Sequence, residues 1–357
     1  MLVNAQNHKK IVVGVSGGVD SSVVAYLLKQ QGYDVHGVFV KTWSPEWLPC
    51  TWIDEKRDAM RVCAALDIPF HFLDAEQAYK DGVADYMIAQ YRKGVTPNPD
   101  VLCNRVIKFG VLWEYAQSIG AEMLATGHYA QVVDGQLKKG IDESKDQSYF
   151  LWMLTKEELP RVTFPIGHLR KSEVRALAEK AGLMTATKKD SQGICFLGDV
   201  DMREFLSHYI DQKKGPVVNQ KGDSIGEHDG VWFYTLGERH GFRITEEGTH
   251  RPAYYVVNKN IETNTLVVSP VAQVVSQNNG IQRISLRDVN WIEALSIEGV
   301  YTGQIRYHGA QLPVHIIDTT TIEITYDGVV ALGQSIVFYE GDVLIGGGVV
   351  DAVIPAV

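Results

Sequence analysis

One short segment near the N-terminus restricts the possible folds more than any other. Residues 11–15 (IVVGV) are typical of a buried strand, residues 20–31 of a helix with one apolar face, and the loop between them contains Gly17 and Gly18. Paired glycines let the backbone approach a bound group without hindrance from a Cβ atom, and the free N–H groups at a helix start favour an anion. The segment therefore predicts a strand–loop–helix unit that binds phosphate at the carboxyl end of a strand, where open α/β sheets bind ligands.

The alternation of strand and helix continues through the first two hundred residues. Apolar runs predict further strands at 35–40, 70–73 and 123–125, and periodic apolar positions predict helices near 54–66, 76–92 and 105–119. This order predicts an α/β fold in which a parallel sheet is covered by helices on both faces.

The pattern changes after residue 205. Glycine-rich turns then separate short segments rich in Val, Ile, Thr and Tyr, and residues alternate with period two at 321–326 and 335–339. A chain of 357 residues allows two or three domains at about 150 residues each. We expect a catalytic domain over 1–205, a small linker domain over 206–276 and an all-β barrel or sandwich over 277–357.

The loop over residues 14–22 (GVSGGVDSS) differs from the common lysine-containing phosphate loop. The pattern GxxxxGK[ST] is absent and the loop has no lysine. The charge of a bound phosphate must then be compensated by backbone dipoles, by Mg²⁺ or by a lysine elsewhere in the chain. A glycine turn that only connects strand and helix is the alternative, but its place at the carboxyl end of a strand favours a nucleotide site.

Four cysteines, at positions 50, 63, 103 and 195, are too few for a secreted disulfide scaffold. Cys103 and Cys195 follow polar segments that contain Pro or Gly, so we expect both in loops, where chemistry is more common than packing. Cys63 falls on an apolar helical pattern and is expected to be buried. Cys50 fits neither description. A zinc or iron–sulfur site is disfavoured because no C-x-x-C pair exists and the spacings match no standard arrangement.

The charge distribution argues against broad nonspecific nucleic-acid binding but allows binding at one local stretch. The net charge of −9, from 34 basic and 43 acidic residues, argues against broad nonspecific binding. Residues 161–189 nevertheless hold seven basic and two acidic side chains, and this local excess could follow a phosphate backbone or be an ordinary solvated helix face. No run of 18 apolar residues and no targeting segment is present, so we expect a cytoplasmic protein without membrane contact.

The SGGVDSS segment resembles the pyrophosphate loop of the PP-loop ATP pyrophosphatases. That resemblance implies a Rossmann-like fold of the HUP type and cleavage of ATP to AMP and pyrophosphate. Seven segments together resemble the bacterial tRNA-specific 2-thiouridylases in order and spacing: SGGVDSS (16–22), TPNPDVLCN (96–104), ATGHYA (125–130), KDQSYFL (145–151), DSQGICF (190–196), YTLG (234–237) and GGG (346–348). The narrower resemblance covers nearly the whole chain and implies a small linker domain and a C-terminal β-barrel that contacts tRNA.

The resemblance assigns site residues position by position. It implies an ATP site made by Gly14, Val15, Ser16, Gly17, Gly18, Val19, Asp20, Ser21, Val40 and Gly127. It implies contacts with the target base and the tRNA from Asn98, Pro99, Asp100, His128, Lys145, Asp146, Gln147, Arg306, Tyr307 and Gln334. Without the resemblance, His128 would more often be a structural histidine, a solvated turn would explain Lys145–Gln147 equally well, and exposed strand ends would be the better explanation of Arg306, Tyr307 and Gln334.

The resemblance also implies the chemistry. Such enzymes adenylate the C2 oxygen of wobble uridine 34 in tRNAs for lysine, glutamate and glutamine and replace it with sulfur. Cys195 would receive a persulfide from a donor protein, Cys103 would be its partner, and a disulfide between the two would form. Thiolates suit sulfur transfer because exchange proceeds through mixed disulfides. ATP and Mg²⁺ are the expected cofactors, with no tightly bound metal or iron–sulfur cluster.

Asp100, three residues before Cys103, is the candidate general acid or base, with a helix N-cap as its alternative role. The chain departs from the family pattern at three positions: Val40 replaces the usual Met, Glu238 the usual Gln, and Leu332 the usual Pro. Two other functions stay open. Another PP-loop adenylator, such as a tRNA lysidine synthetase or an amide-forming ligase, would need no cysteine pair, and a nucleotide-sensing or RNA-binding module would bind ATP without turnover.

Overall fold

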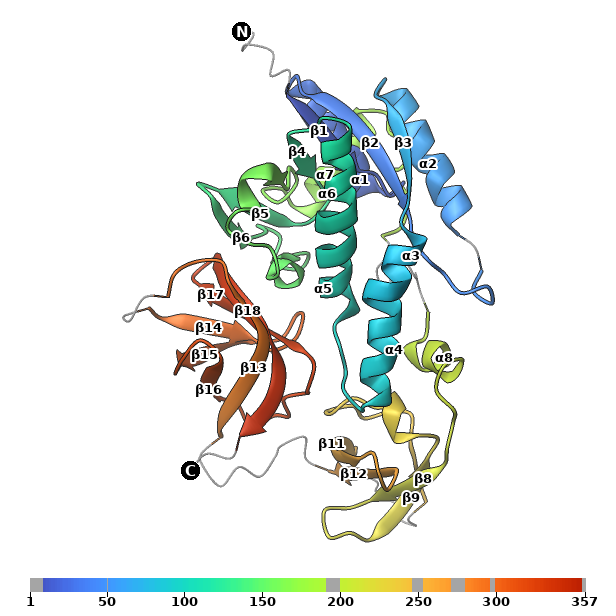
Figure 1. Cartoon of the computed structure of the whole chain (residues 1–357), viewed down its shortest axis with the longest axis vertical. Coiled ribbons are helices and arrows are strands. Elements are labelled where there is room, and N and C mark those ends of the chain that lie inside the picture. Colours follow the sequence, from blue (N-terminus) through green and yellow to red (C-terminus); the bar gives the residue numbers. More distant parts are fainter. Residues whose placement is uncertain are drawn as a thin grey trace.

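The computed structural model describes residues 9–49, 51–190, 200–245, 253–270, 280–295 and 299–354. Its N-terminal part contains a five-stranded parallel sheet of order β3-β2-β1-β4-β7 (Figure 1). The strands are β1 (Lys10–Gly14), β2 (Asp34–Lys41), β3 (Phe70–Asp74), β4 (Met123–Ala125) and β7 (Val162–Thr163). The expected parallel sheet is confirmed, and its first three strands lie within one or two residues of their predicted positions.

Alternating side chains of β1 explain why helices cover both faces of this sheet. Ile11 and Val13 are fully buried in one core with α1 (Val19–Gln30), α2 (Trp52–Ala65) and α7 (Lys171–Lys180). Val12 is fully buried in a second core on the opposite face. Because successive side chains of a strand point to opposite faces, three consecutive apolar residues anchor helices on both sides.

Two long helical segments cover that second face. The first joins α3 (Glu76–Tyr79), the π-helix η1 (Lys80–Ala84) and α4 (Asp85–Arg92), and the second joins α5 (Pro99–Cys103), the π-helix η2 (Asn104–Val111) and α6 (Leu112–Ser118). In Figure 1 both run away from the sheet toward the lower half of the molecule. Among the described residues, no helix is long and apolar enough to span a membrane.

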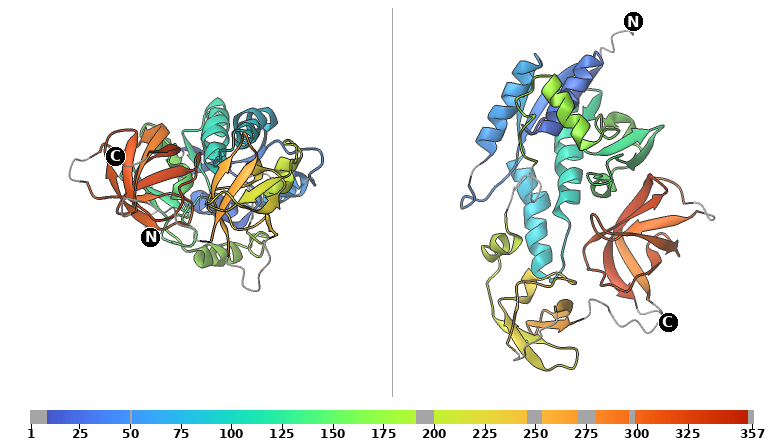
Figure 2. Two further views of the ribbon diagram at one scale, coloured as in Figure 1. Left: turned by 90° about the horizontal axis from the view of Figure 1, so that it is seen from below. Right: turned by 180° about the vertical axis from the view of Figure 1, so that it is seen from behind.

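The middle part is a small five-stranded sheet of order β10-β9-β8-β12-β11. It follows α8 (Met202–Ser207) and the strands are β8 (Gly215–Val218), β9 (Ser224–His228), β10 (Arg243–Ile244), β11 (Tyr255–Asn260) and β12 (Thr265–Ser269). Figures 1 and 2 show this sheet at the far end of α4, on the opposite side of the molecule from the N-terminal sheet.

The C-terminal part is a closed antiparallel barrel. Its strands are β13 (Ile281–Trp291), β14 (Tyr301–Gln304), β15 (Gln311–Ile316), β16 (Thr321–Thr325), β17 (Ser335–Glu340) and β18 (Val343–Ile354), and pairing of β13 with β18 closes it. The hairpin of β5 (Ala130–Val133) and β6 (Gln136–Lys139) from the N-terminal part joins β18 through the pair Val343 and Lys138. This closure decides between the barrel and the sandwich that the sequence left open.

Buried polar contacts fix the barrel to the N-terminal part. The Tyr149 hydroxyl donates to the Ser335 carbonyl over 2.8 Å, and the Trp152 indole N–H donates to the Ser335 hydroxyl over 3.1 Å. A Cβ atom on Gly347 would lie 2.7 Å from the Trp152 ring, so the central glycine of the GGG segment makes room for this ring. All three side chains that contribute these bonds are buried, and a buried bond that loses one partner leaves the other group unsatisfied.

Candidate active site

The phosphate loop lies where the sequence predicts it, between the carboxyl end of β1 and the first turn of α1. Gly17 has a positive φ of 71°, and a Cβ atom there would come within 2.5 Å of the Glu55 carbonyl oxygen on α2. The Ser22 hydroxyl donates to the Gly18 carbonyl over 2.7 Å, and Ser21 Oγ accepts from the Ser16 N–H over 3.2 Å. The loop is thus fixed by its own hydroxyls around the free N–H groups of a helix start, which is a geometry that binds anions.

Two further predicted ATP residues flank this loop. A Cβ atom on Gly127 would lie 3.1 Å from the Ser21 nitrogen and 3.2 Å from the Asp20 Cβ, so only a glycine lets the end of β4 pack so closely on α1. Val40 is 7% exposed near the carboxyl end of β2, two residues beyond the pair Gly14 and Val38. The structure therefore brings Gly14–Ser21, Val40 and Gly127 to one edge of the sheet.

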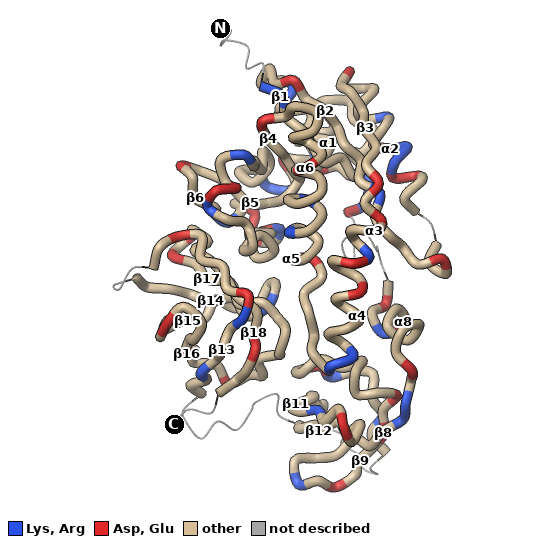
Figure 3. The backbone as a smooth tube through the Cα atoms, viewed as in Figure 1, with Lys and Arg blue, Asp and Glu red and all other residues tan. Residues whose placement is uncertain are grey.

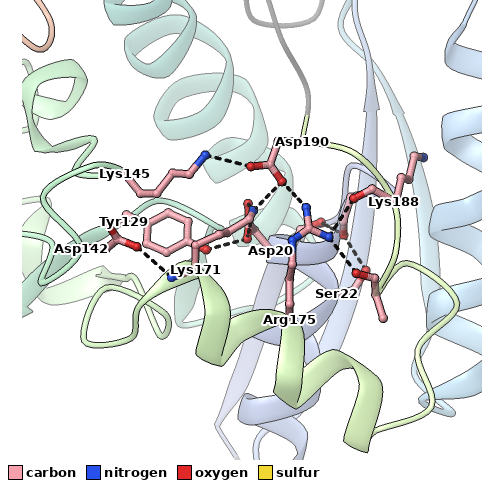
Figure 4. A network of polar contacts seen from close by, with 12 residues as sticks. Asp20, Ser22, Tyr129, Asp142, Lys145, Lys171, Arg175, Lys188 and Asp190 are labelled. Carbon is pink, nitrogen blue, oxygen red and sulfur yellow. Dashed lines mark hydrogen bonds and ion pairs between the residues drawn. The ribbon is translucent and has the colours of Figure 1, made fainter.

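Lysines from distant parts of the chain supply the charge that the loop lacks (Figure 4). Lys171 Nζ lies 2.8 Å from both carboxylate oxygens of Asp20, in the first turn of α1. Lys188 Nζ donates to the Gly17 carbonyl over 3.0 Å and pairs with Asp58 at 2.7 Å. A lysine elsewhere in the chain was one of three sources of charge that the sequence allowed, and its position could not be predicted, because Lys171 and Lys188 belong to the basic stretch assigned to tRNA or to solvent.

Asp190 is the shared acceptor of this cluster. Its carboxylate pairs with Lys145 at 2.9 Å, Lys171 at 3.0 Å and Arg175 at 2.6 Å. Burial opposes ionisation of Asp190, but the hydrogen bonds and charges of Lys145 and Lys171 outweigh it and lower the pKa of this carboxyl to about 2. Figure 3 shows basic and acidic positions interspersed along the backbone. The cations of this cluster are paired with the Asp190 carboxylate in the structure.

The segment around Cys103 corrects one sequence prediction. Cys103 was expected in a loop, but it ends helix α5, whose chain continues directly into η2, and its side chain is fully buried. Asn98 is the N-cap, because its side-chain oxygen accepts from the Val101 N–H over 3.3 Å, and Pro99 occupies the first helical turn, where its missing N–H costs nothing. A cap and a following proline are a helix-start signal that was present in the sequence.

That geometry also settles one alternative for Asp100. Because Asn98 caps the helix, Asp100 is not the N-cap; it lies in the first turn of α5 and is partly exposed. The pKa of Tyr307 in the barrel is raised to about 12, first by burial and then by the charges of Asp146 and Asp100. The catalytic assignment of Asp100 stays a prediction.

Cys195, with the rest of the DSQGICF segment after Asp190, lies outside the described residues, as does Cys50. Its pairing with Cys103 is therefore a prediction that the described geometry does not reach. Cys63, by contrast, is 1% exposed on α2, and burial raises the pKa of its thiol to about 11. Cys63 is the buried apolar residue that its helical pattern indicates.

Three residues expected to contact tRNA are engaged within the protein. His128 is 5% exposed; its Nδ1 lies 2.7 Å from the Thr126 hydroxyl and its Nε2 3.2 Å from Lys108 Nζ. Burial, and then the charge of Lys108, holds the pKa of His128 well below its usual value. Asp146 accepts from the Gly140 N–H over 2.9 Å, and Gln147 from the Tyr129 N–H over 3.1 Å. These three therefore support the loop next to Lys145, and direct RNA contact by them stays a prediction.

The three barrel residues expected to contact tRNA differ in their exposure and in their contacts within the protein. Arg306 is exposed, and the Tyr307 ring packs against Phe150 with a 4.4 Å centroid distance. Gln334 is partly buried and donates to the carbonyl oxygens of Thr96 and Pro97, over 3.0 Å and 3.3 Å. Arg306 is thus free to face a large ligand in this structure, whereas Gln334 holds the segment just before Asn98.

Comparison with known proteins places these features in one context. The chain matches the tRNA methyl transferase HUP domain family over residues 9–199, the tRNA methyl transferase PRC-barrel domain family over 203–270 and the aminomethyltransferase β-barrel domain family over 281–350. It is 44% identical to the tRNA-specific 2-thiouridylase MnmA of Geobacillus thermodenitrificans, with 98% of this chain and 96% of that protein covered.

Two more relatives carry the same name. The Enterococcus faecalis protein is 42% identical, with 97% of this chain and 96% of its own length covered, and the protein of Escherichia coli strain K12 is 42% identical, with 98% and 99% covered. The domain families are named after methyl transfer and the full-length relatives after thiolation. The relatives cover the loop, both cysteine segments and the barrel together, so they describe the whole chain better than a single domain name does.

Proposed function

Because the chain belongs to the tRNA-specific 2-thiouridylase family, it is an ATP-using tRNA sulfurtransferase, and we propose that Cys195 and Cys103 carry the sulfur while the loop over Gly14–Ser21 holds ATP. The observation that supports the ATP half is the start of α1, whose first N–H groups follow the Gly17–Gly18 loop at the carboxyl end of β1, because a helix N-terminus favours an anion. The close approach of Gly17 to the Glu55 carbonyl holds this loop against α2.

The first half of the reaction is adenylation of wobble uridine 34. The C2 oxygen of the uracil attacks the α-phosphorus of ATP, the bond to the β-phosphate breaks, and pyrophosphate leaves. Lys171 and Lys188 lie beside the loop, and either can exchange a carboxylate or carbonyl partner for a phosphate oxygen. Such preorganised cations stabilise the charge that develops on the leaving pyrophosphate.

Mg²⁺ fits this arrangement as a companion of ATP. The ion usually keeps several waters and binds through phosphates with one or two carboxylates. Asp20, in the first turn of α1, is partly exposed and orients its oxygens toward the Tyr129 hydroxyl at 2.8 Å and toward Lys171. We propose Asp20 as the carboxylate that would hold the ion, which would neutralise phosphate charge when bound.

The second half of the reaction replaces oxygen by sulfur. The outer sulfur of a Cys195 persulfide attacks C2, AMP leaves, and the Cys103 thiolate then attacks the Cys195 sulfur, which frees the thiocarbonyl and leaves a disulfide between the two cysteines. Alternatively, Cys103 attacks first and releases hydrosulfide, which attacks C2. Both routes consume two electrons, so a thiol reductant must restore the cysteines. Asp100, three residues before Cys103, is proposed to transfer the proton at the reacting base.

The substrates in this proposal are the tRNAs for lysine, glutamate and glutamine, and the sulfur comes from a protein persulfide such as that of a cysteine desulfurase or a sulfur relay. We place the reaction in the cytoplasm, with the tRNA. The target uridine must leave its stack to reach a thiol, which unstacked anticodon bases do readily.

Mass spectrometry of tRNA nucleosides tests this function. After incubation of tRNA with the enzyme, ATP, Mg²⁺ and a sulfide source, we expect 2-thiouridine, and we expect none when ATP is omitted. Persulfide-dependent product from the Cys195→Ser variant at the full rate would remove Cys195 from the mechanism. Pyrophosphate release without tRNA, and no thiolated product with it, would indicate a different adenylating enzyme.

A further inference from the structure

The chain segment that precedes Asn98 is held from the barrel. Gln334 Nε2 donates to the Thr96 carbonyl over 3.0 Å and to the Pro97 carbonyl over 3.3 Å. In the opposite sense, the Thr96 N–H donates to the Leu332 carbonyl over 3.1 Å. In Figure 1 this segment is the connection between α4 and α5, and it passes beside the barrel. A single residue, Thr96, is therefore bound through both its backbone groups by one turn of the barrel, residues 331–334.

The turn over residues 331–334 packs so closely on residues 95–97 that only a glycine fits at position 333. Gly333 has a φ of 85°, and a Cβ atom there would lie 2.3 Å from Val95 Cγ1 and 2.9 Å from the Thr96 carbonyl oxygen. Any side chain at this position would push the segment away from the barrel, in addition to the strain of the positive φ. The contact thus depends on a glycine as well as on the Gln334 amide.

The turn itself is firmly anchored. The Gly333 N–H donates to the Val350 carbonyl over 2.9 Å, and the Val350 N–H donates to the Gln334 carbonyl over 2.9 Å. Val350 belongs to β18, which pairs with both β13 and β17. On the other side of the segment, the Thr96 hydroxyl lies 3.1 Å from the Thr235 hydroxyl of the middle part. Thr96 is 8% exposed and is held from both later domains.

We propose that Gln334 is a positioning residue for the reaction: with Gly333 it sets the path of residues 95–97 and so the place of Asn98, which caps the helix that carries Asp100 and Cys103. This inference rests on the proposed function and assigns Gln334 a role within the protein in place of the tRNA contact that the resemblance implies. Small displacements matter in such a site, because misplacing a catalytic group by about 1 Å can reduce the rate by about a hundredfold.

The barrel offers a matched control for this amide. Gln282 is 8% exposed and likewise donates from Nε2 to two backbone carbonyls, those of Tyr326 and Gly328, over 2.6 Å and 2.8 Å. Both partners lie within the barrel. Gln282→Ala therefore removes the same chemistry without touching residues 95–97.

The test compares Gln334→Ala and Gln282→Ala in the full-length enzyme. For each variant we would measure the melting temperature, the dissociation constant for unmodified substrate tRNA by filter binding, and kcat and KM for tRNA-dependent pyrophosphate release. For Gln334→Ala we expect kcat to fall by about tenfold or more, with the tRNA dissociation constant within about twofold of wild type. For Gln282→Ala we expect kcat near the wild-type value at any temperature where the protein is folded.

Gly333→Ala provides a second perturbation of the same contact, without removing any side chain that could bind RNA. It should also lower kcat while tRNA binding persists. The proposal is overturned if Gln334→Ala weakens tRNA binding but keeps kcat at saturating tRNA, if neither substitution changes kcat, or if Gln282→Ala loses as much activity as Gln334→Ala. If the wild-type enzyme releases no pyrophosphate with tRNA, the proposed function fails instead, which is a different result.

Discussion

Lys188 donates a hydrogen bond from Nζ to the carbonyl oxygen of Gly17 over 3.0 Å, so a cation 171 positions further along the chain completes a loop that has no lysine of its own. The same ammonium pairs with Asp58 of α2 at 2.7 Å. Lys188 thus connects the phosphate loop to a neighbouring helix and brings a positive charge to that loop.

Removal of this charge should weaken ATP binding. A hydrogen bond to a charged group contributes about 1.5–3 kcal/mol, so Lys188→Ala should raise the ATP dissociation constant by about tenfold or more. Lys180 is exposed at the end of α7, and Lys180→Ala is the matched control, with ATP binding expected to stay at the wild-type level. Isothermal titration with ATP and Mg²⁺ measures both. Equal effects of the two substitutions would remove Lys188 from the site.

The two glycines of the phosphate loop should differ in their tolerance of a methyl group. At Gly17 a Cβ atom would lie 2.5 Å from the Glu55 carbonyl and φ is positive, whereas at Gly18 φ is −92° and the nearest atom, Ser16 Oγ, is 3.3 Å away. Gly17→Ala should therefore abolish measurable ATP binding and lower the melting temperature, and Gly18→Ala should reduce affinity only modestly. Isothermal titration with ATP and thermal unfolding measure both variants. Equal ATP affinities and equal melting temperatures of the two variants would contradict the explanation from backbone geometry.

The two described cysteines should resist alkylation, but only one should respond to tRNA. Cys63 is 1% exposed with a thiol pKa of about 11, and Cys103 is fully buried. With iodoacetamide at pH 8 we expect slow labelling of both in the native enzyme and rapid labelling in urea, because the thiolate is the reactive form and needs access. Substrate tRNA should accelerate labelling of Cys103 and leave Cys63 unchanged. Peptide mass spectrometry measures each site, and a Cys103 rate that tRNA does not change would count against its role in catalysis.

His128 should make the enzyme less stable in mild acid. Its native pKa lies well below the usual 6.5, first through burial, so below pH 6.5 the unfolded state binds a proton that the native state refuses. The free energy of unfolding therefore falls as the pH decreases through 6.5 because of this residue. Urea unfolding of wild type and His128→Gln should converge in stability as the pH is lowered. A constant difference between the two proteins would show that His128 is protonated normally.

The sequence predicts much of the fold and the place of the phosphate loop. The strand–loop–helix unit at 11–31 and the barrel strands follow from periodicity, because apolar spacing reports directly on which face is buried. The helical segment that carries Cys103 begins at Pro99, before its predicted start near residue 105, because Asn98 and Pro99 form a helix start within the polar TPNP segment. The expected domain bounds at 205 and 276 stay predictions.

The remaining site features depend on contacts between distant residues. Lys171, Lys188 and Asp190 meet Asp20 and Gly17 only once α7 packs on α1, and periodicity does not report such pairings. For the same reason the position of Gln334 against Thr96, 238 residues earlier, could not be read from the local pattern of the barrel.

In the proposed reaction the C2 oxygen of the target uridine leaves as part of AMP. The most direct measurement uses substrate tRNA labelled with ¹⁸O at C2 of uridine 34, incubated with enzyme, ATP, Mg²⁺ and a persulfide donor, followed by mass spectrometry of the AMP. We expect one ¹⁸O atom in the AMP for each 2-thiouridine formed. Unlabelled AMP alongside thiolated tRNA would contradict the account.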